Sequence, residues 1–534
     1  MKSINTTGWW QDTIFYEVYI SSFQDGNGDG IGDFKGLTQR LDYLKSLGIN
    51  GLWITPFYPS PKVDNGYDVA NYVDVDPDFG SLADFDHFIH EAHQRDIKVI
   101  IDVVLNHVSS KHEWFQSAII DPNSPYRDYF IFQDKPNNWE SFFGGSAWTK
   151  EPNGQQYYYH KFAPEQVDLN WQNPAVKEEL IKVLQFWLDR GVDGFRFDVI
   201  NFLTCDGIGQ NNPVDDKGEQ QHLYDIDQPS ILENIQLVVT SVKDYAKGLN
   251  KVPFLVGEVG HDKLEKLVPY QGRQLLDVVF NFNLGSVAEF NIEYIYEQLV
   301  KMEDLHKGLP TLFFNSHDMP RSMSRLCQNN VDHAKALAAL LLTAKGVSFL
   351  YFGEEIGMPD FMPADIEQIC DVKALTHYEL AKQQRLSDAE AFKKALDESR
   401  DKSRLYMQWD NSIYSGFSDT KPWIGDKCQQ TMPSVCEQQL TSSSLWYWYR
   451  ELLNLRRSTP ALSRGSYQSL TLNNQLLTLK RQYQQTNVVV FINFNTESQT
   501  VYVDKPYKIL ASFGAQGVHA IKLQPFGVCI AEII

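Results

Sequence analysis

The sequence predicts an α/β protein whose core is a (β/α)8 TIM barrel, with a small domain inserted after the third strand and an antiparallel β domain at the C-terminus. Eight short apolar runs alternate with amphipathic helical patterns, which is typical of a parallel barrel. A long segment rich in Trp, Asn, Gly and Tyr separates the third run from the fourth. Beyond residue 465, short alternating segments such as 476–481 and 488–494 replace the helical patterns.

The eight apolar runs have the length and composition of buried parallel strands, which are apolar on both faces. A closed parallel barrel needs eight strands, so each run is assigned to one of them. The runs cover residues 14–20, 51–55, 99–104, 194–199, 254–258, 278–282, 311–314 and 347–352.

The helix before the fourth strand has the clearest ends. Asn173 can cap its N-terminus, Pro174 suits the first helical position, and Gly191 follows its last turn. Apolar side chains recur at helical spacing and would pack on the barrel, at Val176, Leu180, Val183, Leu184 and Trp187.

These patterns define the domain boundaries. Residues 1–105 and 173–464 are the two parts of the barrel, 106–172 are the inserted domain, and 465–534 are the C-terminal β domain. A polar stretch over 358–437 and a helix over 443–457 precede that last domain.

The net charge of -20 over 534 residues argues against nucleic acid or an anionic membrane as the main partner, because both are bound through clustered Lys and Arg. The expected partner is a neutral polar small molecule. No apolar window approaches the length of a membrane span, and the N-terminus lacks a secretory pattern. We therefore expect a cytoplasmic protein that is a monomer or a small homo-oligomer.

Six cysteines are scattered along the chain without a C-x-x-C pair, so we expect reduced thiols and no zinc site. Only Cys428 and Cys436 lie close enough in one loop for a disulfide, and the sequence leaves that pairing open.

Three carboxylates stand at the ends of predicted strands: Asp198 after Gly-Phe-Arg-Phe, Glu258 after Phe-Leu-Val-Gly, and Asp318 after Phe-Phe-Asn-Ser-His. Barrel enzymes carry their chemistry at this C-terminal face. Cleavage of a glycosidic bond with retained configuration needs one carboxylate as nucleophile and a second as acid and then base. Each carboxylate alone could serve as a cap or an ion-pair partner, but the three together favour catalysis.

The surroundings of Asp198 and Glu258 predict their charge states. Arg196 lies two residues before Asp198 on the same side of the strand, where its guanidinium is expected to keep Asp198 ionised and aimed. Burial after an apolar run is expected to raise the pKa of Glu258 toward that of a general acid.

Four short segments, 102–107 (Asp-Val-Val-Leu-Asn-His), 194–198, 257–258 and 315–318, resemble in order and spacing the four sequence regions of the α-amylase family, glycoside hydrolase family 13. The resemblance covers nearly the whole chain. It implies that Asp198 is the nucleophile, Glu258 the acid/base, and Asp318 the carboxylate that grips the sugar hydroxyls. It also implies a first sugar subsite, with neutral imidazoles as hydrogen-bond donors, formed by Tyr67, Asp68, His107, Arg196 and His317.

The chain is most similar to the oligo-1,6-glucosidase, dextran glucosidase and trehalose-6-phosphate hydrolase branch of that family. Segments 166–171 (Gln-Val-Asp-Leu-Asn-Trp) and 407–410 (Met-Gln-Trp-Asp) resemble motifs of the branch, and Arg404 matches its sugar-contacting Arg. Departures at Leu405, Tyr406, Phe352 and Met319, and a segment after Phe282 that looks shortened, concern the outer subsites.

An Asp/Asn/Gly-rich loop follows the first strand. Its oxygen donors alternate as in the first half of an EF-hand loop, but Gly36 stands where that loop carries its bidentate Glu. The alternative is a turn without an ion. The resemblance implies a structural Ca²⁺ or Mg²⁺ held by Asp25, Asn27, Asp29, the Ile31 carbonyl and Asp33, and no organic cofactor.

The expected function is a retaining, exo-acting α-glucosidase that releases glucose from the non-reducing end of short α-glucosides. Val199, beside the nucleophile, accompanies α-1,6 preference in enzymes that this chain resembles, so isomalto-oligosaccharides are the expected substrates. The alternatives are a trehalose-6-phosphate hydrolase, an α-1,4-preferring α-glucosidase, and, outside enzymes, a transporter heavy-chain relative.

Overall fold

The computed structural model describes residues 8–152, 154–261, 263–305, 309–426, 432–503, 505–517 and 520–534. Its centre is a parallel sheet of eight strands in the order β11-β10-β9-β3-β2-β1-β13-β12, which forms a nearly closed barrel. The predicted fold class is confirmed, and each predicted apolar run contains one strand of this sheet: β1 (Ile14–Val18), β2 (Gly51–Ile54), β3 (Lys98–Val103), β9 (Gly194–Phe197), β10 (Phe254–Gly257), β11 (Val278–Val279), β12 (Thr311–Leu312) and β13 (Val347–Tyr351).

All eight strands end one to three residues before the predicted runs do, and β11 and β12 keep only two residues each. β11 ends at Val279 because the Asn281 side chain accepts a hydrogen bond from the Asn283 N–H and caps α9 (Phe282–Gly285). β12 likewise ends at Leu312 rather than at residue 314. The predictions over 278–282 and 311–314 were therefore wrong at their C-terminal ends.

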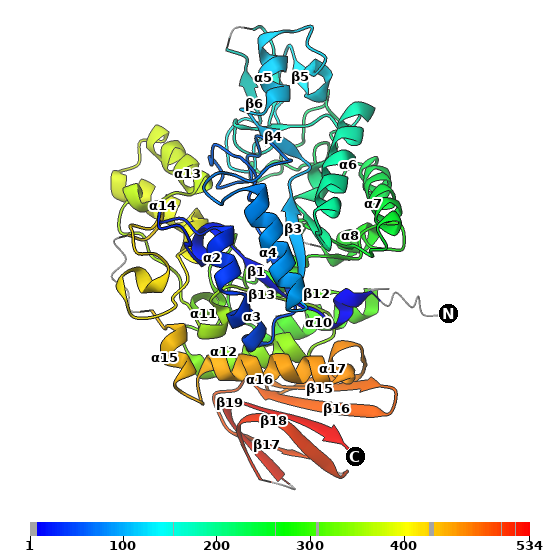
Figure 1. Ribbon diagram of the computed structural model, residues 1–534, viewed down its shortest axis with the longest axis vertical. Helices are drawn as coiled ribbons and strands as arrows, with labels where there is room; N and C mark the ends of the chain where they lie inside the picture. Colours follow the sequence, from blue (N-terminus) through cyan, green and yellow to red (C-terminus); the bar gives the residue numbers. More distant parts are fainter. Residues whose placement is uncertain are drawn as a thin grey trace.

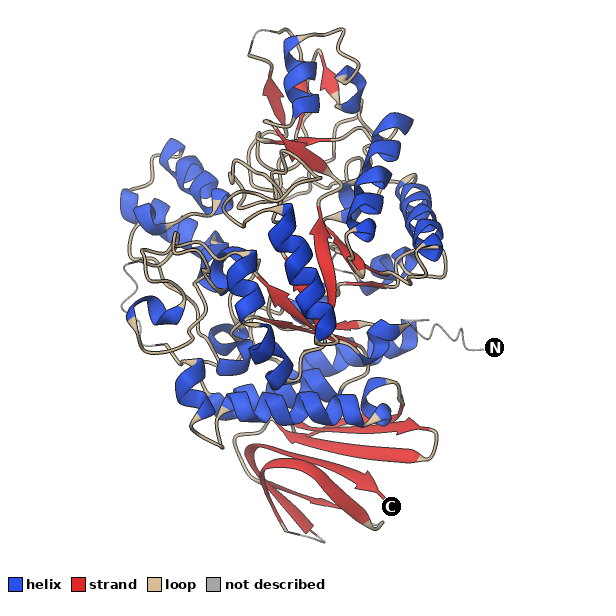
Figure 2. Ribbon diagram, viewed as in Figure 1, coloured by secondary structure: helices blue, strands red, loops and turns tan. Residues whose placement is uncertain are grey.

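Helices surround the barrel sheet (Figure 2). The predicted helix before the fourth strand is α6 (Pro174–Asp189), which Asn173 caps by accepting from the Ala175 N–H. The other long helices that follow the strands are α4 (Leu82–Gln94), α7 (Ile231–Gly248), α10 (Ile292–Leu305), α12 (Val331–Thr343) and α16 (Leu445–Ser458). Shorter ones are η1 (Trp9–Asp12), α1 (Ile20–Phe23), α2 (Phe34–Gln39), α3 (Leu41–Leu47), η3 (Ile200–Phe202), α8 (Leu264–Leu267), η4 (Val268–Tyr270), α11 (Ser322–Arg325), η5 (Glu354–Ile356), η6 (Ile366–Gln368), η7 (Arg400–Ser403), η8 (Ile413–Gly416), α15 (Val435–Gln439) and α17 (Pro460–Ser463).

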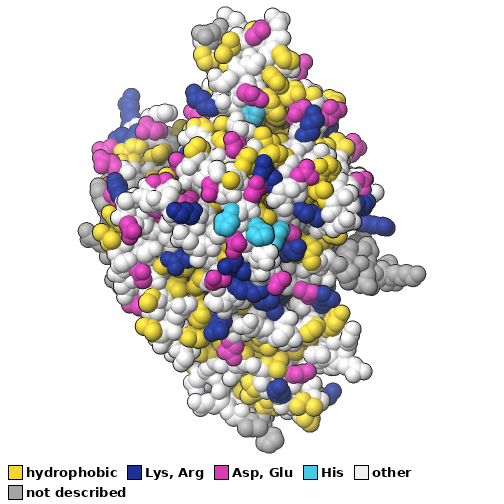
Figure 3. Space-filling model, in the orientation of Figure 1, with side chains coloured by type: hydrophobic (Ala, Val, Ile, Leu, Met, Phe, Trp, Pro, Cys, Tyr) yellow, Lys and Arg dark blue, Asp and Glu magenta, His cyan; other side chains and the backbone are white. Residues whose placement is uncertain are grey.

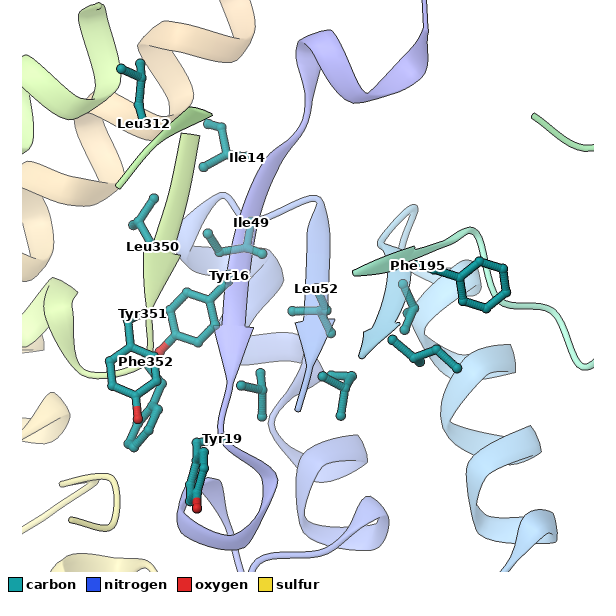
Figure 4. Close-up of a cluster of buried hydrophobic side chains, with 14 of the residues drawn as sticks. Ile14, Tyr16, Tyr19, Ile49, Leu52, Phe195, Leu312, Leu350, Tyr351 and Phe352 are labelled. Carbon is teal, nitrogen blue, oxygen red and sulfur yellow. The ribbon is translucent and has the colours of Figure 1, made fainter. Parts of the chain in front are cut away.

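Side chains alternate along the strands between two buried layers. Tyr16, Leu52 and Leu350 project from neighbouring strands into one large cluster that also contains the apolar sides of the helices (Figure 4). The alternate positions, such as Phe15 and Phe349, pack with one another in a separate aromatic cluster. Their rings stack with centroids 5.1 Å apart. The barrel interior below the site is therefore filled by packed aromatic and aliphatic side chains.

The segment between β3 and α6 forms two small sheets at the end of the molecule opposite the C-terminal sheet (Figure 1). β4 (His107–Ser109) pairs antiparallel with β8 (Gln166–Asp168), which brings the two ends of the segment together. The rest consists of α5 (Glu113–Ile120), η2 (Arg127–Tyr129), β5 (Phe132–Gln133), β6 (Trp148–Lys150) and β7 (Tyr157–Tyr159).

The chain after β13 contains two helices that the sequence patterns did not predict, α13 (Val372–Gln383) and α14 (Asp388–Glu398). The predicted C-terminal antiparallel sheet is confirmed. Arg481 from that sheet is buried and donates to the Thr343 carbonyl at the end of α12, which fastens the sheet to the barrel. Its strands are β14 (Ser466–Asn473), β15 (Leu476–Tyr483), β16 (Thr486–Asn493), β17 (Gln499–Tyr502), β18 (Tyr507–Gln516) and β19 (Ala520–Ile533).

On the face shown in Figure 3, acidic and basic side chains are interspersed. Within the described ranges, no helix is long and apolar enough to cross a membrane. Cys205, Cys327, Cys370, Cys436 and Cys529 are free thiols. Cys428 lies outside the described residues, so its pairing with Cys436 stays open.

Candidate active site

The three predicted carboxylates meet at the C-terminal face of the barrel. Asp198 is the first residue after β9 and Glu258 the first after β10, so the parallel register of these strands places them side by side. Asp318 follows β12 on the loop before α11. The exposed fraction of the side chain rises from 9% for Asp198 to 15% for Glu258 and 31% for Asp318.

Arg196 joins two of these carboxylates. Its Nη1 donates to Asp198 Oδ1 at 2.6 Å and to Asp102 Oδ1 at 2.8 Å, and its Nη2 donates to Glu258 Oε2. One guanidinium therefore holds Asp198 and Glu258 as neighbours, and a retaining glycosidase needs its two carboxylates close together.

Burial separates the acidities of this pair. It raises the pKa of Asp198 to about 6 against the opposing charge of Arg196, so the guanidinium offsets burial only in part. It raises the pKa of Glu258 to about 7, again against Arg196, and the charges of Asp198 and Asp318 add to the rise. Asp198 is therefore mostly ionised at pH 7 while a large fraction of Glu258 keeps its proton.

Asp318 has the opposite environment. Burial disfavours its charge, but His317, Arg400 and Arg404 together outweigh burial and hold its pKa well below the usual range. His317 Nε2 lies 3.1 Å from Asp318 Oδ2, and Arg404 Nη2 donates to Asp318 Oδ1 at 3.1 Å. Asp318 is thus ionised at neutral pH.

The prediction of a neutral imidazole is wrong for His317. Its Nδ1 contacts Glu17 and its Nε2 contacts Asp318. Burial alone would lower its pKa, but the two carboxylates raise it to about 9. His317 therefore favours the protonated form at pH 7, because each ring nitrogen faces a carboxyl group.

His107 agrees with the expectation, since burial lowers its pKa to about 4 and leaves it neutral. It lies within hydrogen-bond distance of the Tyr67 carbonyl, at 3.1 Å. The Tyr67 hydroxyl is 3.0 Å from Asp102 Oδ2 and 2.7 Å from His317 Nε2, so Tyr67 links the two sides of the site.

Asp68 is fully buried, and its hydrogen bonds run to the loop just before it. It accepts from the Ser60 hydroxyl at 2.9 Å and from the backbone N–H groups of Val63 and Asp64 at 2.9 and 3.0 Å. Burial raises its pKa to about 6. In this structure Asp68 shapes the loop that carries Asp64 and Tyr67.

Val199 has a strained backbone directly after Asp198. Its φ of 37° and ψ of 47° lie in the left-handed region, which β-branched residues rarely adopt. The Val199 N–H donates to Glu258 Oε2 at 3.3 Å. Its side chain packs against a cluster that includes Phe143 and Phe162. The strain thus lies directly after Asp198, in a residue whose backbone N–H reaches Glu258.

Sequence reasoning gave no role to three groups that complete the site: Glu17, Asp102 and Arg400. Glu17 and Asp102 are acidic residues inside the apolar runs of β1 and β3. An acidic residue within a predicted buried strand is the sequence signal that identifies both as candidate site residues. Arg400 has no such signal, because its partners Asp64 and Asp318 are distant in sequence.

A cavity of about 710 Å³ opens beside Glu258 and Val199. Aromatic rings dominate its walls, and none of the described residues that line it is Lys or Arg. The aromatic lining consists of Phe142, Phe162, Phe202, Phe282 and Tyr294.

The loop after β1 carries the predicted metal donors. Asp25 accepts from the backbone N–H groups of Asn27, Gly28 and Gly30, and Asp33 caps α2 by accepting from the Gly36 N–H. These oxygen donors suit a hard cation. Over the described ranges, no three His, Cys, Asp or Glu side chains cluster as a metal group. The ion stays a prediction.

Comparison with known proteins agrees with this geometry. A family model described as "Alpha amylase, catalytic domain" matches residues 17–465. The chain is 39% identical to a trehalose-6-phosphate hydrolase of Escherichia coli (strain K12) over 92% of both chains. It is 36% identical to an oligo-1,6-glucosidase of Halalkalibacterium halodurans, over 92% of this chain and 91% of that protein.

Among solved structures, the trehalulose synthase of Pseudomonas mesoacidophila MX-45 is 32% identical, with a TM-score of 0.90 over 99% of this chain and all of the other. Carboxylates at barrel strand ends, the match to the catalytic-domain model and these full-length likenesses lead to one conclusion. The chain belongs to the α-amylase family and is a glycoside hydrolase.

Proposed function

We propose that this enzyme is a retaining, exo-acting α-glucosidase for short neutral α-glucosides, with a preference for α-1,6 links. The observation that carries the proposal is the pair Asp198 and Glu258 on one guanidinium, Arg196. In this proposal the ionised Asp198 attacks the anomeric carbon, and the protonated Glu258 gives its proton to the leaving oxygen. Glu258 then takes a proton from the water that releases glucose.

Asp318 supplies a fixed negative charge next to this pair. Its oxygens face His317, Arg400 and Arg404, so the carboxylate is held in one orientation. Held in this way, it can accept hydrogen bonds from two sugar hydroxyls and favour the distorted ring of an oxocarbenium-like transition state.

The exo mode is supported by the wall beyond Asp318. Arg400 Nη2 donates to Asp64 Oδ1 at 2.6 Å and to Asp371 Oδ1 at 2.5 Å, and the guanidinium also faces the Phe143 ring. These buried ion pairs fill the space on that side, while the large cavity opens on the Glu258 side. A site closed at one end accepts a single terminal sugar.

A neutral leaving group is supported by the aromatic cavity. The phosphate of trehalose 6-phosphate needs Arg or Lys partners, and the described lining of this cavity offers His261 and Glu289 but no Lys or Arg. This favours the glucosidase over the trehalose-6-phosphate hydrolase, although the E. coli hydrolase is similar along the chain. The transporter heavy-chain alternative is set aside, since the chain is a glycoside hydrolase.

The preference for α-1,6 over α-1,4 links rests on Val199, whose β-branched side chain borders both the nucleophile and the cavity.

A cytoplasmic location is part of the proposal and is supported by the five free thiols of the described chain. A structural Ca²⁺ or Mg²⁺ in the loop over 25–33 is also proposed.

A substrate panel tests the assignment. We expect the purified enzyme to cleave isomaltose faster than maltose and to leave trehalose 6-phosphate uncleaved, with α-glucose as the first product by NMR. First formation of β-glucose would overturn the retaining mechanism. Cleavage of trehalose 6-phosphate alone would overturn the substrate assignment.

A further inference from the structure

A buried ion pair joins two segments of the chain that line the cavity beside Glu258. Lys161 of the inserted segment donates from Nζ to Asp225 Oδ2 at 2.7 Å, and Asp225 lies in the segment over 203–230 that connects η3 to α7. The side chain of Lys161 is 1% exposed and that of Asp225 is 0% exposed. Lysine is almost never buried so completely unless it is paired, so each charge requires its partner in place.

The other polar atoms of the pair are bonded as well. The Lys161 ammonium donates to the Glu140 carbonyl at 3.0 Å and lies 3.2 Å from His222 Nδ1. Asp225 Oδ1 accepts from the Asn212 side-chain amide at 2.9 Å. Burial disfavours the charge of Asp225, but His222 and Lys161 hold its pKa below the usual range. Because a buried charge that loses its partner is costly, the pair opposes any sliding of one segment along the other.

Three residues of the cavity wall are adjacent to this pair. Phe162 follows Lys161 directly and lines the cavity. Ile226 follows Asp225 directly and lines it as well. Phe142, a third lining residue, donates its backbone N–H to the Lys161 carbonyl at 2.7 Å, and its ring centroid is 5.7 Å from that of Phe162. The pair therefore fixes Phe142 and Phe162 of the inserted segment relative to Ile226 of the other segment.

The position of these walls bears on the placement of the leaving group. Neither Lys161 nor Asp225 lines the cavity, so the pair can act on a substrate only through its neighbours. Glu258 does line it, and in the proposed function Glu258 gives its proton to the leaving oxygen. A leaving sugar must fit between the walls while its oxygen stays within hydrogen-bond distance of Glu258. A displacement of about 1 Å is enough to disturb such an alignment.

We propose that Lys161 and Asp225 are positioning residues that determine which leaving group this enzyme accepts. Their ion pair holds Phe142, Phe162 and Ile226 at the separation that suits the leaving group, without contact to the substrate. The inference rests on the proposed function, because it concerns the leaving-group side of the same site. A role in stability alone would make the pair matter equally for every substrate.

Two substrates with different leaving groups test the proposal on the whole enzyme. One is the panel substrate that the parent enzyme cleaves fastest, which is isomaltose in the proposed function. The other is α-glucosyl fluoride, whose leaving group is a single atom and does not fill the cavity. Both give the same glycosyl-enzyme, and kcat/KM reports the steps up to its formation, so the ratio of the two kcat/KM values isolates the leaving-group side.

Lys161→Met removes the charge and keeps an unbranched side chain. We expect it to lower kcat/KM on isomaltose by about 10- to 100-fold, because the walls lose their alignment. On α-glucosyl fluoride kcat/KM should change by less than about twofold, since the first sugar subsite is intact.

A second variant keeps the test decisive if Lys161→Met does not fold, since that substitution leaves Asp225 buried without its partner. The double variant Lys161→Met/Asp225→Leu carries neither charge, and replacing a buried pair by apolar residues is often neutral for stability. It should retain the melting temperature and still show the lowered ratio, because apolar contacts have no fixed direction.

Lys335→Met is the matched control. Lys335 is 6% exposed, and its Nζ donates to the Ser443 carbonyl, away from the cavity. Loss of this buried lysine should lower the melting temperature without changing the ratio.

A ratio that falls in the Lys161 variants but not in Lys335→Met supports the proposal. An unchanged ratio in a folded Lys161 variant overturns it, and so does an equal loss on both substrates, which indicates a purely structural role. Failure of the proposed function looks different, because the parent enzyme itself then prefers maltose or trehalose 6-phosphate in the panel. The ratio is in that case measured with the preferred substrate, and the same outcomes decide the role of the pair.

Discussion

The two sides of the active site are built from different chemistry. On one side, buried charges contact one another around Arg196 and Asp318, at the ends of barrel strands and at η7. On the other side, the cavity beside Glu258 is wide and aromatic, and its walls come from the inserted segment and from the segments after β9, β10 and β11. In the proposed mechanism the reaction therefore depends mainly on carboxylates at strand ends, whereas the choice of leaving group depends on side chains carried on loops.

This contrast predicts that substitutions on the charged side abolish turnover of every substrate, whereas substitutions on the cavity side change which substrate is cleaved fastest.

The largest effect is expected from the carboxylate pair itself. Asp198→Asn and Glu258→Gln should each lower kcat on isomaltose by several orders of magnitude with an unchanged melting curve, because each removes one partner of a two-step displacement. Glu113→Gln, an exposed carboxylate on α5, is the control and should be neutral.

Azide assigns the two roles. With an activated aryl α-glucoside, azide should partly restore turnover of Glu258→Ala and give the α-glucosyl azide, since Asp198 still forms the glycosyl-enzyme. If Glu258→Ala instead gave the β-glucosyl azide, Glu258 would be the nucleophile and Asp198 the acid/base. Near-normal turnover of Asp198→Asn would contradict the mechanism.

The next largest effect concerns Val199, on the cavity side. Val199→Ala or Val199→Thr should raise kcat/KM on maltose with little loss on isomaltose, because a smaller or polar side chain relieves the approach of an α-1,4-linked sugar. One or two methyl groups in a pocket change discrimination by about 10- to 200-fold. Ratios of kcat/KM on the two disaccharides measure this, and a parent enzyme that already prefers maltose would contradict the assignment.

The pH profile examines the charged side without substitution. Asp198 must be ionised, so activity should fall as the pH decreases through about 6; Glu258 must be protonated, so activity should fall as the pH increases through about 7. The two groups interact, so the limbs of the bell report the pair. Far from the optimum each limb should fall about tenfold per pH unit. In Glu258→Gln the alkaline limb should disappear, and an alkaline limb that persists would assign it to another group.

The smallest effect is expected from the metal loop, which lies outside both sides of the site. Removal of a bound ion by EDTA should lower the melting temperature by a few degrees, because an ion that binds only the folded state stabilises it. Added Ca²⁺ or Mg²⁺ should restore the original value. Asp29→Asn, at an exposed position of the loop, should reduce the effect of EDTA on the melting temperature. A melting temperature that EDTA does not change would favour the turn without an ion.

The amino-acid sequence by itself determined the barrel and its three carboxylates. Apolar runs of strand length, the Asn173 and Pro174 helix start and acidic residues directly after the runs are local features, and local features can be read from one chain. The ends of β11 and β12 were less predictable, since Asn281 began a helix where the apolar pattern continued.

Only the tertiary structure decided which charges meet. Glu17 and His317 are 300 residues apart, and Arg400 is 336 residues from Asp64. Sequence reasoning therefore left His317 neutral, although two carboxyl groups flank it in the folded chain and favour its protonated form. The reason is physical: a pKa depends on burial and on charges within a few ångströms, and both are fixed only when distant segments pack together.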